Sequence, residues 1–191
     1  MRLRTIRAIV EARVHAERRT LIYACAAAAV VGFIQPRGLA APIFFSSVIG
    51  IVVALLQGPG RYPHLDLCEQ SAPLFGRELA RAKALVPCVV AALATATYCA
   101  AAFVGGGSGI PTTFVIALAA VVPSTLTALS ATIRSGSSRL LYVALACAIS
   151  AIAFLLSVLA GSVPAELGFA ALVSFFALRQ YGEALARYDP V

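Results

Sequence analysis

Charged side chains are scarce in this chain. Only 12% of its 191 residues are Asp, Glu, Lys or Arg, whereas soluble domains contain about 25%. Hydrophobic residues make up 61% of the chain, and the mean hydropathy is +0.92. A soluble core of this size cannot enclose so many apolar side chains. The composition therefore excludes an ordinary soluble domain and indicates an integral membrane protein.

The side chains that enzymes and metal sites need are also few. His15 and His64 lie outside the apolar runs, so no run offers a base to a serine such as Ser108. Asp66 and Glu69 stand alone, without the paired acids of a metal-dependent transferase. The five cysteines include no Cys-x-x-Cys pair, which favours reduced packing residues over a metal site. We therefore expect no catalysis, no metal and no cofactor.

The sequence also lacks the Gly-x-x-x-x-Gly-Lys-Ser/Thr pattern of an ATP-binding loop. Its glycine-rich stretch, residues 105–109, has no lysine after it and predicts a flexible turn. Any use of ATP would therefore have to come from a separate subunit.

Long apolar runs are abundant. They cover residues 20–34, 39–57, 84–104, 110–133, 140–160 and 163–178, and Glu166 is the one charged residue within them. A helix needs about 20 apolar residues to cross a hydrocarbon core of about 30 Å. The runs are too long and too uniform for membrane β-strands. We predict an all-α polytopic membrane protein with six transmembrane helices in a membrane domain over residues 20–191.

The basic residues predict the orientation. With the N-terminus inside, fourteen of the 15 Lys and Arg residues fall in inner segments, and Arg37 alone lies outside. Positively charged loops stay in the cytoplasm, so we expect both termini on the cytoplasmic side of the plasma (inner) membrane, which the alanine-rich composition suggests is bacterial. This topology explains the net charge of +7, which therefore gives no reason to expect a nucleic-acid partner.

Residues 1–19 show helical periodicity. Leu3, Ile6, Ile9, Val10 and Val14 recur three and four apart among Arg and Glu residues. This pattern predicts an amphipathic helix along the cytoplasmic interface of the lipid bilayer, with a solvated basic lead-in as the alternative.

The first two runs are separated by only residues 35–38, which predicts a tight antiparallel hairpin of two spans. A cleaved secretory leader ending near residues 39–41 is disfavoured, because the leader contains Glu11 and Glu17 and apolar character resumes after Gly38.

Residues 58–83 form the one sizeable polar connection. Gly58, Pro59 and Gly60 end the second run, and a short amphipathic helix can begin with Ser71 as its cap. Apolar residues of this helix share a face, while its charged residues are expected to stay in water. The apolar ones are Leu74, Phe75 and Leu79, and the charged ones are Arg77, Glu78, Arg81 and Lys83. Such a helix can lie passively at the interface or dock on a cytoplasmic partner.

The order of these elements, with the phrases His-Leu-Asp-Leu at 64–67, Ser-Ala-Pro-Leu at 71–74 and Leu-Ala-Arg-Ala-Lys-Ala-Leu at 79–85, resembles the membrane subunit of ABC-2-type exporters. The resemblance covers the N-terminal half of the chain. It implies a homodimer or heterodimer of six-span subunits, with a coupling helix at 65–83 that docks on a separate ATP-binding subunit. The implied contact residues are Leu65, Leu67, Leu74, Phe75, Arg77, Glu78, Leu79 and Arg81. The chain departs from the family where 161–164 leads directly into the last run, since the family usually has a longer external connection there.

Two other functions remain open. One is the substrate-binding membrane subunit of a vitamin-type ABC importer, which a four-residue first external loop disfavours. The other is a non-transporting accessory or assembly protein. The sequence names neither a substrate nor a direction of transport.

Within the runs, Pro123 predicts a kink that is either a hinge or static. Hydroxyl groups in the third and fourth runs either line a pathway or bond to their own helices. They belong to Thr95, Thr97, Tyr98, Ser124 and Thr125. For Glu166, a position in a first helical turn favours a role at the helix N-terminus over a substrate contact.

Overall fold

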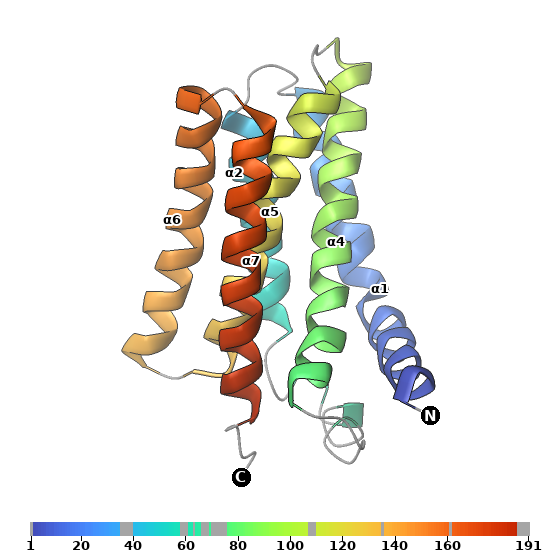
Figure 1. Ribbon diagram of the computed structural model, residues 1–191. Coiled ribbons are helices and arrows are strands. Elements are labelled where there is room, and N and C mark those ends of the chain that lie inside the picture. The colour runs from blue at the N-terminus through green and yellow to red at the C-terminus, as the bar shows by residue number, and fades with distance from the viewer. Residues whose placement is uncertain are drawn as a thin grey trace.

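The computed structural model describes residues 2–34, 40–57, 61–62, 64–65, 69, 76–106, 110–134, 136–160 and 162–186. Its long elements are α1 (Arg2–Ile34), α2 (Ala40–Leu56), α4 (Gly76–Val104), α5 (Ile110–Thr132), α6 (Ser137–Ala160) and α7 (Val163–Ala186). They run up and down the molecule in turn, and both termini lie at the same end (Figure 1). The prediction of an all-α fold is confirmed for the described residues.

Three helices are long and apolar enough to cross a membrane. They are Glu78–Val104 in α4, Pro111–Thr132 in α5 and Ser137–Leu159 in α6, while Ala41–Leu56 in α2 is apolar but shorter. Three of the six predicted spans are thus supported among the described residues. In the two other long helices the apolar stretch adjoins charged residues, which are Arg18 and Arg19 in α1 and Arg179 in α7.

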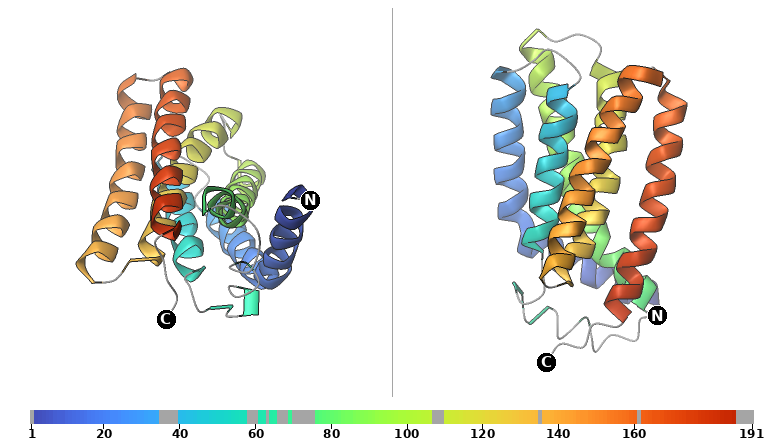
Figure 2. Two further views of the ribbon diagram at one scale, coloured as in Figure 1. Left: turned by 60° about the horizontal axis from the view of Figure 1, so that its bottom comes forward. Right: turned by 90° about the vertical axis from the view of Figure 1, so that its left-hand side faces the viewer.

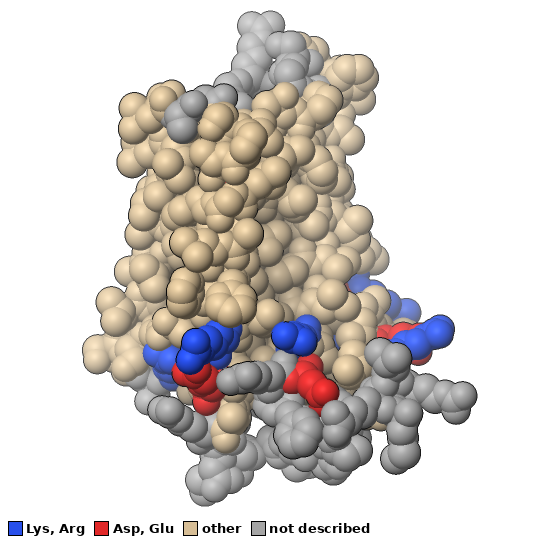
Figure 3. All heavy atoms as spheres, viewed as in Figure 1, with Lys and Arg blue, Asp and Glu red and all other residues tan. Residues whose placement is uncertain are grey.

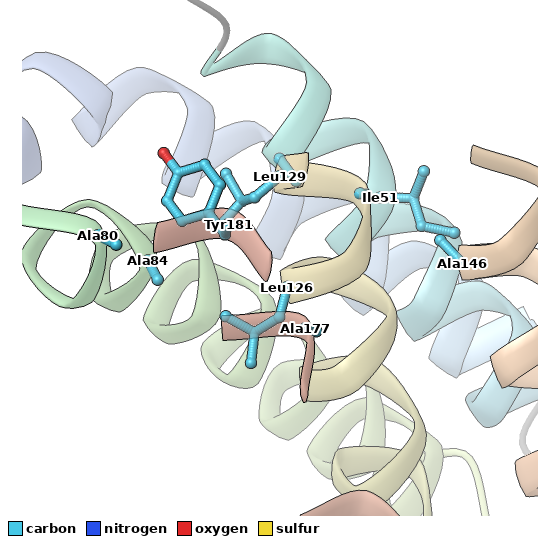
Figure 4. Packing of buried hydrophobic residues seen from close by; sticks show 10 residues of the cluster. Ile51, Ala80, Ala84, Leu126, Leu129, Ala146, Ala177 and Tyr181 are labelled. Atoms are coloured by element: carbon cyan, nitrogen blue, oxygen red, sulfur yellow. The ribbon is translucent and has the colours of Figure 1, made fainter. Parts of the chain in front are cut away.

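The helix α5 lies at the centre of the bundle and packs against α2, α4, α6 and α7. In its apolar segment 78% of the residues are buried, compared with 28% in α6. Figure 4 shows side chains of five helices meeting around Leu126 and Leu129 of α5. Most of their partners are small, which allows the helices to approach closely. The labelled partners are Ile51, Ala80, Ala84, Ala146, Ala177 and Tyr181.

The first helix packs mainly against α4 and only lightly against α2, so the expected tight hairpin of the first two spans is wrong. The small residues Ala24, Ala28 and Gly32 recur four apart on α1, and Ala28 is fully buried against α4. A Cβ atom added at Gly32 would overlap the backbone oxygen of Tyr98. The spacing of small residues therefore lets α1 reach the backbone of α4.

Two positions where the sequence predicts one helix to end and another to begin lie inside continuous helices. The predicted helix over 1–19 and the first predicted span form one helix, α1, because no Gly or Pro interrupts it before Gly32. Figure 2 (right) shows its N-terminal part turned sideways from the rest. Likewise, the predicted cytoplasmic helix and the third span form one helix, α4, with Glu78 in its first turn and Pro87 inside it. The proposed cap, Ser71, lies outside the described residues.

Charge is concentrated at one end of the molecule. Figure 3 shows Lys, Arg, Asp and Glu gathered near the end that holds the termini, below a face without charged side chains. Large apolar side chains remain exposed along the outer helices, including Leu159 of α6 and Phe175 of α7. An apolar flank with a charged end is compatible with a membrane protein.

Candidate functional site

The predicted coupling residues differ in how exposed their side chains are. Arg81 is exposed at the start of α4, whereas three others are half-buried: Leu65, Glu78 and Leu79. The remainder fall outside the described residues, namely Leu67, Leu74, Phe75 and the side chain of Arg77.

A buried cluster of charges ties the connection between α2 and α4 to the bundle. Arg13 of α1 donates to both carboxylate oxygens of Glu69, with Nη2 at 2.7 Å from Oε2 and Nε bonded to Oε1. The Nζ atom of Lys83 in α4 lies 2.8 Å from the same Oε2. Arg13 and Glu69 are each 3% exposed. Because Glu69 pairs with both cations, it joins α1 to α4.

This cluster corrects one expectation. Lys83 is not in water, since its side chain is only 13% exposed. The sequence offered one signal: Arg13 occurs on an amphipathic helix among apolar residues, where a partly buried cation needs an acid. Which acid would meet it depends on how α1 and α4 pack.

A second buried acid, Glu17, lies one turn further along α1. It is 2% exposed, and neither of its carboxylate oxygens accepts a hydrogen bond from the described residues. The Nη1 atom of Arg61 is 3.8 Å from its Oε1. Arg61 also donates to the carbonyl oxygen of Leu56 at 2.8 Å and to Oγ1 of Thr20 at 3.4 Å. These contacts fix the Arg61 side chain between α1 and the end of α2.

Tyr62 fastens the same segment. Its hydroxyl donates to the backbone oxygen of Ala16 at 3.3 Å, and the Arg61 guanidinium lies 5.3 Å from the centre of its ring. Burial, helped by the negative charge of Glu17, raises the pKa of the Tyr62 hydroxyl above its ordinary value. The chain after α2 is thus held against α1 at residues 61–62 and again at Glu69.

The exposed part of the predicted coupling surface adjoins α7. A cavity of about 270 Å³ is lined by Arg81 of α4 and by Phe175, Leu178 and Arg179 of α7. The Nε atom of Arg179 lies 2.9 Å from Oε1 of Glu183, and both side chains are substantially exposed. Sequence reasoning missed the α7 residues because they are remote from 65–83 along the chain. The change from an apolar run to Arg179 was the available signal.

Four of the five hydroxyl groups singled out in the sequence bond to their own helices. In α5, Ser124 donates to the carbonyl oxygen of Ala120 at 2.9 Å and Thr125 to that of Val121 at 2.6 Å. In α4, Thr95 and Thr97 do the same one turn back. For these four hydroxyls the structure has bonding to the helix, and a pathway role for Tyr98 stays a prediction.

Pro123 is fully buried inside a continuous α5. Its carbonyl oxygen accepts a hydrogen bond from Oγ1 of Thr127 at 2.8 Å. The hinge at Pro123 stays a prediction.

Glu166 lies in the first turn of α7, as expected, and its backbone N–H bonds to the carbonyl oxygen of Ser162 at 3.4 Å. Its side chain is buried, which the sequence did not predict, and Oε2 has no hydrogen-bond partner among the described residues.

Within the described part of the chain, no three His, Cys, Asp or Glu side chains lie close enough together to hold a metal ion. The four described cysteines are free: Cys25, Cys88, Cys99 and Cys147.

The chain matches no protein-family model, no curated protein and no solved structure.

Proposed function

We propose that this chain is a transmembrane subunit of an ATP-driven, ABC-2-like transporter. In this proposal the chain crosses the plasma membrane six times with both termini in the cytoplasm. It docks on a separate ATP-binding subunit through the segment 65–83, and two such membrane subunits, identical or different, enclose the substrate pathway.

The observation that carries the proposal is the buried cluster of Arg13, Glu69 and Lys83. A segment that receives a push from a partner must be joined firmly to the helices that respond. Glu69 lies inside this segment and pairs with one cation on α1 and another on α4. Paired charges of this kind are costly to separate when they are buried. A displacement of the segment would therefore pass to both helices.

The lengths of α7 and α2 are compatible with further spans beyond the three long apolar helices. The apolar residues 163–178 of α7 give about 24 Å of helix at 1.5 Å per residue, somewhat short of a hydrocarbon core of about 30 Å. The 17 residues of α2 give about 26 Å, which a locally thinned bilayer accommodates. Basic residues occur at every connection of the charged end, including Arg134 just after α5 and Arg139 in the first turn of α6. A charged cytoplasmic end follows from this distribution.

A pathway between two subunits is compatible with the packing of α5. Four other helices pack against it, and Ser124, Thr125 and Thr127 donate to carbonyl oxygens of their own helix. These three hydroxyls are therefore used within α5, and in this proposal the polar groups of a pathway lie on the outer faces, between two subunits.

The test is affinity purification of the tagged full chain from its native membrane in mild detergent, followed by mass spectrometry of the proteins recovered with it. Arg81→Glu reverses an exposed charge on the proposed docking surface. Arg139→Glu makes the same change at an exposed site in the first turn of α6 and serves as the control. We expect an ATP-binding subunit with the native chain and with Arg139→Glu, and little of it with Arg81→Glu.

Failure to recover a nucleotide-binding protein with the native chain would count against the transporter and favour an accessory protein. Equal recovery with both variants would show that segment 65–83 is not the docking surface.

A further inference from the structure

A groove opens between α1 and α2 because α1 packs on α4 instead of its neighbour in the chain. Its volume is about 510 Å³, within the range of about 300–1,000 Å³ usual for small-molecule sites. Figure 2 (right) shows α1 and α2 next to each other on the same side of the bundle. The groove is bounded by two helices that carry exposed apolar side chains, such as Tyr23 and Val48.

Polar and apolar lining residues occupy opposite ends of this groove. Arg19, Thr20 and Arg61 line it near the charged end of the molecule, and Ala27 and Val48 line it further up. Eight residues of helix separate Arg19 from Ala27, which is about 12 Å. The groove thus presents cationic donors at one end and a purely apolar track beyond them.

The two arginines are placed differently. Arg61 is fixed at the mouth by its bonds to Leu56 and Thr20, and the nearby Glu17 carboxylate offsets part of its charge. Arg19 is exposed on α1 and lines the same mouth. Guanidinium groups bind phosphate oxygens through paired N–H donors. Arg19 therefore supplies most of the net positive charge, and Arg61 supplies a positioned donor.

We propose that this groove binds one anionic phospholipid, with its phosphate between Arg19 and Arg61 and an acyl chain along Ala27 and Val48. The charge complementarity at the mouth selects this occupant. A purely apolar occupant, such as a neighbouring helix, would bury the exposed guanidinium of Arg19 without offering it an acceptor, which is costly. A free phosphate would leave the apolar track empty. A phospholipid satisfies both ends, and basic pockets on the cytoplasmic side of membrane helices suit such head groups.

The test measures lipid binding to the purified full chain by native mass spectrometry, in detergent containing either phosphatidylglycerol or phosphatidylcholine. Arg19→Gln removes the main charge, and Arg19→Lys retains it. Ala27→Phe fills the apolar track without touching the arginines. Arg139→Gln removes an exposed charge at the same end of the bundle and is the matched control. Helical content measured by circular dichroism confirms that each variant is folded.

We expect phosphatidylglycerol to bind at least about fivefold more tightly than phosphatidylcholine, since each basic side chain near a lipid surface is worth roughly that factor. Arg19→Gln should weaken phosphatidylglycerol binding by about fivefold. Arg19→Lys and Arg139→Gln should leave it within about twofold of the native value. Ala27→Phe should weaken binding of both lipids.

Equal binding of the two lipids, or equal effects of Arg19→Gln and Arg139→Gln, would overturn the proposal. In a second arm, glycerol phosphate is added at the lipid concentration and thermal unfolding is followed. Protection by glycerol phosphate equal to that by phosphatidylglycerol would assign the mouth to a free phosphate and refute the lipid site. Unchanged binding by Ala27→Phe would also refute it.

Discussion

Replacing Glu69 by Gln is the most direct perturbation of the buried cluster. The substitution keeps the shape of the side chain and removes the negative charge that faces both Arg13 and Lys83. Arg13 and Lys83 then lose the negative charge that they share, while Arg13 is buried and the side chain of Lys83 is only 13% exposed. Because both cations are largely buried, water compensates little of the lost charge interaction.

The expected loss is large for a single side chain. Removing one partner of a buried ion pair typically costs about 3–5 kcal/mol. For a chain of this size, that loss lowers the melting temperature by roughly 6–20 °C. The matched control is Glu11→Gln, which breaks the pair of Glu11 with Arg7, whose side chains are 63% and 82% exposed. An exposed pair of this kind contributes far less to stability than a buried one, because water screens it.

The assay is thermal unfolding of the purified chain in one mild detergent, followed by circular dichroism of the helices. Limited proteolysis with trypsin adds a local readout, because release of the segment would make Arg61 easier to cleave. We expect Glu69→Gln to melt at least 6 °C below the native chain, and Glu11→Gln to melt within about 2 °C of it. If the two variants melt at the same temperature and resist trypsin equally, the segment is not held by this cluster.

Three further predictions concern other parts of the bundle. Gly32→Ala should destabilise the chain by about 1–3 kcal/mol, because the added Cβ atom meets the backbone of Tyr98. At Gly168 an added Cβ atom meets nothing, so Gly168→Ala should gain up to about 1 kcal/mol in helix propensity. Chemical unfolding of the two variants compares their stabilities. The raised pKa of Tyr62 means that the folded state holds its proton more tightly, so this contribution to stability is complete below pH about 10 and declines as pH rises toward the folded pKa. Ultraviolet titration of the phenolates should lose a component above the ordinary tyrosine range in Tyr62→Phe, and a curve that loses only an ordinary component would contradict the assignment. Pro123→Ala should restore a backbone hydrogen bond in α5 and raise the melting temperature of the purified chain, and a lower melting temperature would contradict this expectation.

The candidate site was only partly readable from sequence. The segment 58–83 stood out because it is the one long polar connection, and its acids and Pro and Gly residues are local features. The sequence did not predict that α4 continues without a break from Gly76. The change from polar to apolar residues within it resembles the boundary between two elements. The cavity beside Arg81 was not predicted either, since three of its four described lining residues belong to α7.

The sequence by itself determined the class of the protein and its charge distribution. Long apolar runs with few charges specify helices, and the placement of the arginines specifies which end of the bundle is charged, because both properties depend only on local composition. The tertiary structure alone decided which helices are neighbours. Packing of α1 on α4 brings Arg13 and Lys83 to Glu69, and the same packing opens the groove between α1 and α2. Small residues such as Ala28 and Gly32 permit close approach to many partners, so their spacing could not select α4 before all the helices packed together.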